Sequence, residues 1–116
     1  CFQMTIQELG TIAQKGLPVK IIILNNNFLG MVRQWQQLFF DKRYSFVELQ
    51  NPDFIMIGKG FGIDGHKCED REDLASSIDK LLNSEGSYLL EVVCEKEENV
   101  FPMVPAGTSV SEIRLK

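Results

Sequence analysis

The feature that most limits the fold of this chain is an apolar run that ends abruptly in three asparagines. Residues 19–24 are aliphatic except for Lys20, and Asn25, Asn26 and Asn27 follow directly. A strand that is apolar on both faces is typical of the interior of a parallel sheet, where helices cover both sides. A turn after such a strand needs only one or two asparagines. The sequence therefore predicts a buried parallel strand whose carboxyl end carries more amides than a turn requires.

Helix and strand signals alternate along the rest of the chain. Gly16 is the expected C-cap of a first helix, and Asn51 and Pro52 are the expected N-cap and first position of a later one. This alternation predicts an α/β fold, an open parallel sheet with helices on both faces. The expected elements are a helix over 2–15, a strand over 19–24, helices over 30–40 and 51–60, a strand over 63–68, a helix from 70 with Leu74, Ile78, Leu81 and Leu82 on its apolar face, and a strand over 88–94.

Composition excludes several classes of protein. The 116 residues carry a formal net charge of -4, which argues against binding to nucleic acid. No apolar run has the length of a membrane span, and no signal segment opens the chain. Cys1, Cys68 and Cys94 lack metal-ligand spacing and are expected to be reduced thiols. We expect a cytoplasmic protein that binds neither nucleic acid nor a membrane.

The first residues predict that part of the protein lies upstream. The chain begins without methionine, and Phe2, Ile6 and Leu9 already follow a helical spacing. One small domain, or a piece of a larger one, fits this length.

The asparagines allow two interpretations. Ligands of open parallel sheets bind beyond the carboxyl ends of the strands, where these amides are expected. Amide oxygens suit Mg²⁺ that has anionic ligands elsewhere, and the backbone at Gly30 could approach a diphosphate at the start of the next helix. The simpler interpretation is an asparagine-rich turn that caps this helix. The amides alone leave both open.

Three stretches resemble acetolactate synthase, in its large catalytic subunit: CFQMTIQEL (1–9), NNNFLGMVRQW (25–35) and PMVPAG (102–107). The resemblance extends along the whole chain. Thiamine diphosphate enzymes share a Gly-Asp-Gly that opens the cofactor motif and an Asn-Asn that closes it, and only the closing half is present. The resemblance implies a thiamine diphosphate-binding fold truncated at its N-terminus. Residues 1–95 would be the C-terminal portion of that domain, and residues 96–116 a C-terminal arm.

The same resemblance assigns roles to individual positions. Asn26 would bind Mg²⁺ through its side chain, and Phe28 through its main-chain carbonyl. Val32 and Trp35 would line the substrate pocket, with Ala106 near its mouth. No catalytic residue is expected here, because the glutamate that activates the cofactor belongs to another domain of a partner subunit. The positions expected to line the cofactor are Cys1, Asn26, Phe28, Leu29, Gly30 and Met31.

The activity implied by the resemblance is a carboligation. Pyruvate would be decarboxylated and joined to a second 2-ketoacid, which gives acetolactate or acetohydroxybutyrate for branched-chain amino-acid biosynthesis. Thiamine diphosphate, Mg²⁺ and FAD are the implied cofactors, in a homo-oligomer of at least two subunits that is compatible with a regulatory small subunit. The 116 residues alone are expected to be inactive. The alternatives are another thiamine diphosphate enzyme, of pyruvate oxidase or glyoxylate carboligase type, or a non-catalytic α/β dimerisation module.

Overall fold

The computed structural model describes residues 2–115 and divides them into two compact units. The sheet unit consists of residues 2–26 and 50–94, and the α2 unit consists of residues 27–49 and 95–115. Both units are discontinuous in sequence, and each is described here by itself. The domain boundary expected at residue 95 stays a prediction. No helix within residues 2–115 combines the length and the apolar character needed to cross a membrane.

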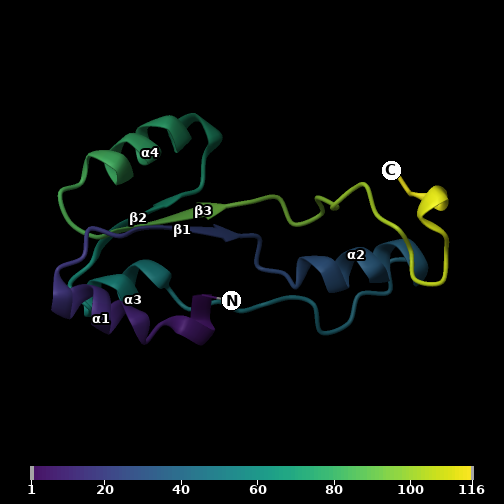
Figure 1. The fold of residues 1–116 in the computed structure, drawn as a ribbon, viewed down its shortest axis with the longest axis horizontal. Helices are drawn as coiled ribbons and strands as arrows, with labels where there is room; N and C mark the ends of the chain where they lie inside the picture. The colour runs from purple at the N-terminus through teal and green to yellow at the C-terminus, as the bar shows by residue number, and fades with distance from the viewer. Residues whose placement is uncertain (1, 116) are drawn as a thin grey trace. The chain divides into compact units, whose positions relative to one another are not determined.

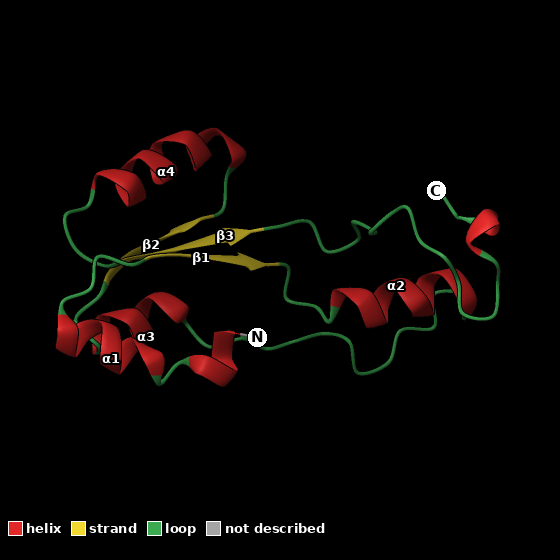
Figure 2. Cartoon of the chain, in the orientation of Figure 1, coloured by secondary structure: helices red, strands yellow, loops and turns green. Residues whose placement is uncertain are grey.

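The sheet unit is a parallel sheet covered by helices on both faces (Figures 1 and 2). Its strand order is β1-β3-β2 within the described residues, and both pairs are parallel. Helices α1 and α3 cover one face and α4 covers the other. The predicted α/β fold class is therefore confirmed. The bounds are β1 (Lys20–Asn25), β2 (Asp64–Cys68), β3 (Tyr88–Val93), α1 (Glu8–Lys15), α3 (Phe54–Gly60) and α4 (Leu74–Asn83).

The central strand β3 supplies a buried side chain to the hydrophobic core on each face. Leu89 and Leu90 are neighbours in a strand and therefore point to opposite faces, and both are fully buried. Burying one leucine side chain stabilises a fold by roughly 1.5–3 kcal/mol, so each layer is held firmly to β3. The cluster under α1 and α3 contains Leu9, Phe54, Ile63 and Leu89, and the cluster under α4 contains Cys68, Leu81 and Leu90.

Strand β1 lies at an edge of this sheet, and the prediction that it is the interior strand is wrong for the described residues. Ile22 is 53% exposed and Leu24 is 73% exposed, whereas β3 occupies the centre. Local composition predicts a strand that is apolar on both faces. It does not specify which strands pair on its two sides.

Three helix starts differ from the sequence predictions. The helix expected from residue 70 begins as α4 at Leu74, after a 3-10 turn, η2 (Arg71–Asp73). Residues 2–15 form a 3-10 turn, η1 (Phe2–Thr5), followed by α1, instead of one helix. The N-cap of α3 is Asp53, whose side chain accepts a 2.8 Å hydrogen bond from the Met56 N–H, and Asn51 does not cap it. An aspartate directly before the helix competes effectively with the asparagine two residues earlier, because both are strong N-caps.

One predicted helix end is confirmed and one predicted packing position is wrong. Gly16 caps α1 with a φ of 60°, a left-handed conformation that glycine adopts without steric cost. Leu82 is 64% exposed, because the core side of α4 is centred on Leu81 and the adjacent position turns away from it.

The α2 unit is built around α2 (Gly30–Phe39), which confirms the helix expected over 30–40. The C-terminal segment is residues 95–115. An antiparallel bridge between Met103 and Arg114 joins two parts of this segment through main-chain hydrogen bonds of 3.0 and 2.8 Å. A short 3-10 helix, η3 (Val110–Glu112), lies inside that loop and is capped by Ser109.

Candidate functional site

The first asparagine, Asn25, is part of the framework of the sheet unit. It is the last residue of β1 and only 8% exposed. Its Nδ2 donates to Oε1 of Glu91 at 2.7 Å, and its Oδ1 accepts from Nδ2 of Asn51 at 2.9 Å. Its carbonyl accepts from the Cys94 N–H at 2.9 Å. Hydrogen bonds therefore fix both the side chain and the main chain of Asn25.

The other two asparagines differ from Asn25 in conformation. Asn26 is half-buried and is the first residue beyond β1. Asn27 has a φ of 55°, in the left-handed region that asparagine tolerates better than most side chains. Asn25 is therefore an anchor and Asn27 turns the chain, while Asn26 lies at the carboxyl end of the strand, where the metal ligand was predicted. That role for Asn26 stays a prediction.

In the α2 unit, the main chain of Phe28 takes part in an antiparallel bridge to Glu48. Both hydrogen bonds of this bridge, each 2.8 Å long, use the residues that flank Phe28 and Glu48. In a pair of this kind the carbonyl of the central residue points away from the partner segment. That direction agrees with the predicted use of the Phe28 carbonyl as a ligand, which remains to be tested.

Helix α2 reverses the usual pattern of burial. Arg33 is 0% exposed and Gln34 is 2% exposed, although both are polar. On the side of α2 that faces away from Arg33 and Gln34, and next to that side, apolar residues are between 36% and 54% exposed. They form a stripe, here called the apolar stripe, of Leu29, Met31, Val32, Trp35 and Phe39. All of these except Phe39 are candidate cofactor or substrate positions.

The polar side of α2 is buried because it binds the C-terminal segment. Nε2 of Gln34 donates to the Val100 carbonyl at 3.0 Å, and the Val100 N–H donates back to Oε1 of Gln34 at 2.8 Å. Nη2 of Arg33 donates to Oδ1 of Asn99 at 2.6 Å and to the Glu98 carbonyl at 3.2 Å. The sequence analysis missed these two residues. The detectable signal was a pair of polar residues between the apolar Val32 and Trp35.

A second glutamine of α2 fixes the loop that follows the helix. Nε2 of Gln36 donates to the Ser45 carbonyl at 3.0 Å, and the Ser45 N–H donates to Oε1 of Gln36 at 2.9 Å. On the apolar stripe, the rings of Trp35 and Phe39 lie 5.0 Å apart between centroids. Glutamines thus hold two loops to α2, while the apolar stripe remains exposed within the described chain.

The remaining candidate positions lie in loops or outside the described residues. Ala106 is exposed in a turn where the Thr108 N–H donates to the Pro105 carbonyl at 3.2 Å. Cys1 lies outside the residues that the structure describes. The predicted cofactor contact of Cys1 and pocket contact of Ala106 therefore stay predictions.

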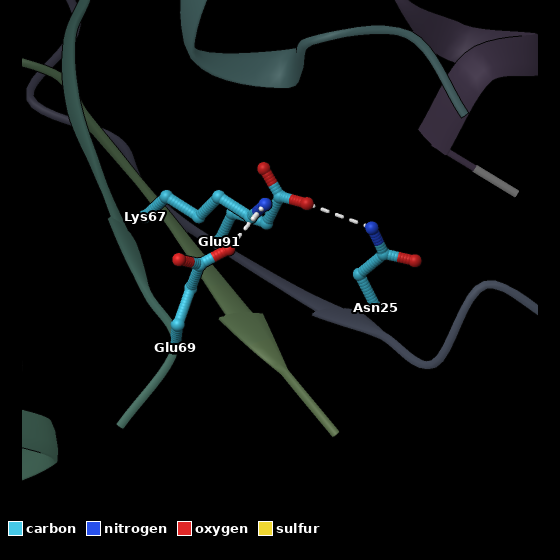
Figure 3. A network of polar contacts seen from close by, with 4 residues as sticks. All are labelled: Asn25, Lys67, Glu69 and Glu91. Atoms are coloured by element: carbon cyan, nitrogen blue, oxygen red, sulfur yellow. Dashed lines mark hydrogen bonds and ion pairs between the residues drawn. The ribbon is translucent and has the colours of Figure 1, made fainter. Parts of the chain in front are cut away.

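Charged residues gather beside Asn25 on the sheet (Figure 3). Lys67 of β2 is paired in register with Glu91 of β3, and its Nζ forms a 2.7 Å ion pair with Glu69. The hydrogen bond to Lys67 lowers the pKa of the Glu69 carboxyl. The pKa of Lys67 is raised, chiefly by that hydrogen bond and further by the charges of Glu69 and Glu91. The negative charge of Glu91 thus lies near a lysine, while its direct hydrogen-bond partner is Asn25.

A parallel sheet with helices on both faces is typical of α/β domains that bind ligands beyond the carboxyl ends of their strands. Comparison with known proteins gives the family of this chain. Residues 1–92 match the family described as thiamine pyrophosphate enzyme, C-terminal TPP binding domain. The chain belongs to this family.

Relatives within the family narrow the resemblance to acetolactate synthases. The chain is 51% identical to acetolactate synthase isozyme 2 large subunit of Escherichia coli, over 97% of this chain and 21% of that protein. It is 44% identical to mitochondrial acetolactate synthase of Schizosaccharomyces pombe, over 98% of this chain and 17% of that protein. The chain thus spans about a fifth of the length of these relatives.

A solved structure supports the fold assignment. The thiamine diphosphate-dependent 4-hydroxybenzoylformate decarboxylase of Rhodococcus jostii superposes with a TM-score of 0.72 at 26% sequence identity. The match covers 84% of this chain and 19% of the decarboxylase chain. The predicted thiamine diphosphate-binding fold is therefore confirmed.

Proposed function

We propose that these residues are part of an acetolactate synthase, a thiamine diphosphate-dependent enzyme that decarboxylates pyruvate and joins the product to a second 2-ketoacid. Acetolactate or acetohydroxybutyrate would result, for branched-chain amino-acid biosynthesis. The observation that carries the proposal is the reversed burial of α2, which exposes Met31, Val32 and Trp35 and buries Arg33 and Gln34. A soluble helix normally buries its apolar side, so an exposed apolar stripe beside the asparagines in sequence indicates a binding surface.

The oxygen donors of the chain fit Mg²⁺ that is shared with a diphosphate. The amide of Asn26 and the carbonyl of Phe28 are neutral, and Mg²⁺ takes oxygen ligands that include carboxylates and phosphates. The two residues would therefore supply part of a coordination shell, and the diphosphate and a carboxylate would supply the anionic part. The first turn of α2 contains no acidic residue that would repel a diphosphate at its N-terminus.

The residues after Phe28 would divide the remaining tasks. Leu29, Gly30 and Met31 would contact the cofactor at the start of α2. Val32, the next residue, and Trp35, about one turn further, would exclude water from the acceptor ketoacid. When bound, thiamine diphosphate supplies the chemistry that decarboxylates the first ketoacid. Ala106 would border the same pocket from the C-terminal segment.

A calorimetric titration with thiamine diphosphate, with and without Mg²⁺, tests the proposal. It compares the 116-residue chain with the full-length protein that carries it, because the Gly-Asp-Gly half of the motif is expected upstream. Saturable, Mg²⁺-dependent binding is expected in the full-length protein and should be abolished by Asn26→Ala. Asn83→Ala, at the exposed end of α4, is the matched control and should bind as the parent does. Unchanged binding by Asn26→Ala would refute the proposed metal site.

A product assay separates this function from the alternatives. The full-length protein with pyruvate should form acetolactate, and the 116-residue chain alone should form none. Hydrogen peroxide as the main product from pyruvate would instead identify the pyruvate oxidase type. Tartronate semialdehyde formed when glyoxylate is offered in place of pyruvate would identify the glyoxylate carboligase type. A folded full-length protein that self-associates without binding cofactor would identify the dimerisation module.

Further parts of the proposal concern the whole protein. We expect a homo-oligomer with FAD on a domain outside these residues, and the arrangement is compatible with a regulatory small subunit. The cytoplasmic location stays a prediction, since one of the relatives named above is mitochondrial.

A further inference from the structure

We infer that Glu91 is a positioning residue, which holds Asn25 so that the next residue, Asn26, leaves the sheet in a single orientation. The inference rests on the proposed function, because it takes Asn26 as the Mg²⁺ ligand. Glu91 does not touch the metal in this arrangement. It acts through its hydrogen bond to Asn25 (Figure 3).

Glu91 is a carboxylate in a buried position, which requires compensating interactions. It is 4% exposed in the central strand β3, directly after the fully buried Leu90. Burying a carboxylate is costly unless hydrogen bonds compensate for the lost hydration. Among the described residues, Asn25 supplies a short hydrogen bond of 2.7 Å to it. Lys67 is adjacent in register, but its 2.7 Å ion pair is with Glu69.

The hydrogen bonds run in one direction and end at Glu91. Gln3 donates to Oδ1 of Asn51 at 3.0 Å, Asn51 donates to Oδ1 of Asn25, and Asn25 donates to the carboxylate. An ionised carboxylate only accepts hydrogen bonds, whereas an amide can present either its oxygen or its NH₂ group. Glu91 is therefore the terminal acceptor of the series. A flipped Asn25 amide would place its oxygen against the carboxylate and its NH₂ group against that of Asn51.

This fixed amide restrains the point where the chain leaves the strand. The side chain of Asn25 is bound at both polar atoms, and its carbonyl is bound to the Cys94 N–H at 2.9 Å. Asn26 follows immediately, so its backbone starts from a defined position and direction. Mutation of a group that orients a metal ligand without touching the metal typically lowers metal affinity by about 10–100-fold.

An exchange of the two functional groups tests the inference in the full-length protein. Asn25→Asp places two carboxylates side by side and removes the donor to Glu91. Glu91→Gln keeps an acceptor for Asn25. The double variant, Asn25→Asp with Glu91→Gln, restores the hydrogen bond in reverse, because the new amide at position 91 can donate to the new carboxylate at position 25. Asn51 can still donate to that carboxylate. Glu69→Gln is the matched control, a carboxylate-to-amide change at an exposed position beside the same lysine.

Two measurements are made, both on protein shown to be folded at the working temperature. The apparent Kd for Mg²⁺ is measured at saturating thiamine diphosphate. The hydrogen exchange of the Cys94 N–H is measured without metal or cofactor, which reports directly on the anchor. Asn25→Asp should weaken Mg²⁺ binding by about 10–100-fold and accelerate that exchange. Glu91→Gln and the double variant should stay within about fivefold of the parent, since a neutral hydrogen bond is only modestly weaker than a charged one. Glu69→Gln should change neither quantity.

The outcomes separate this inference from the proposed function. Unchanged Mg²⁺ affinity in Asn26→Ala overturns the metal site of the proposed function, while the product assay tests the activity separately. A large loss in Asn26→Ala with parental affinity in Asn25→Asp overturns only the role of Glu91. The role also fails if the double variant binds as weakly as Asn25→Asp. If Asn25→Asp does not fold, the double variant decides, and its failure to fold or to bind within the stated range overturns the inference.

Discussion

Replacing Gln34 by methionine should release the C-terminal segment from α2. The side chain of Gln34 forms a reciprocal pair of hydrogen bonds with Val100, and methionine has a similar length but neither polar group. A typical hydrogen bond contributes about 0.5–1.5 kcal/mol, so loss of the pair should lower local stability by about 2 kcal/mol. Because about 1.4 kcal/mol is a factor of ten, the Val100 N–H should exchange about 30-fold faster.

The same helix offers a matched control for this experiment. Gln36 forms an equivalent reciprocal pair with Ser45, but it is less buried than Gln34. Gln36→Met should accelerate exchange at Ser45 by about fivefold, since exposed hydrogen bonds lie at the lower end of the range. Each variant should leave the other site unchanged when hydrogen exchange is followed residue by residue. Parental exchange at Val100 in Gln34→Met, or equal acceleration at both sites, would refute the reasoning.

Two further predictions concern the apolar stripe and the surface charges. Trp35→Leu should leave the thermal unfolding midpoint nearly unchanged, because Trp35 is exposed, but it should raise the KM for the second ketoacid in steady-state kinetics; an unchanged KM with a lowered midpoint would mark Trp35 as a packing residue. The ion pair of Lys67 and Glu69 should make a small, pH-dependent contribution. Its lowered carboxyl pKa means that the contribution is present above the ordinary value of 4.5 and is lost as pH falls through the folded-state pKa, while the raised pKa of Lys67 means that it is lost again above 10.5. The midpoint difference between the parent and Glu69→Gln should therefore be small at pH 7 and disappear once the pH lies below the folded-state pKa of Glu69. A difference that grows in acid would contradict the assignment.

Local patterns predicted most of the elements because their causes are local. The β-branched run produced β1, and Gly16 ended α1 as expected. The helix over 30–40 was also found within one residue of its predicted end. These features depend on backbone preferences and on spacing within a few residues, which a single sequence contains.

The features that were predicted wrongly or missed depend on distant partners. The position of β1 at the edge depends on which strands pair with it. Its partner in the sheet, β3, lies more than 60 residues further along the chain. The burial of Arg33 and Gln34 depends on hydrogen bonds to residues 98–100, which lie about 65 positions further along the chain. For the candidate site, the amides after β1 were recognised from composition and resemblance, but the partner of Asn25 on β3 could not be inferred from spacing.

The three asparagines also determine how this segment can vary in evolution. At position 25 the side chain donates to Glu91 and accepts from Asn51. A substitution there alone should be poorly tolerated, and accepted substitutions should occur together with one at position 91. At position 27 the φ of 55° favours glycine, or another residue suited to the left-handed region, whatever its functional group. Position 26 is constrained instead by the proposed ligand. Three identical letters in a row are therefore subject to three different kinds of selection, and alignments that treat them as one motif would combine constraints of unrelated origin.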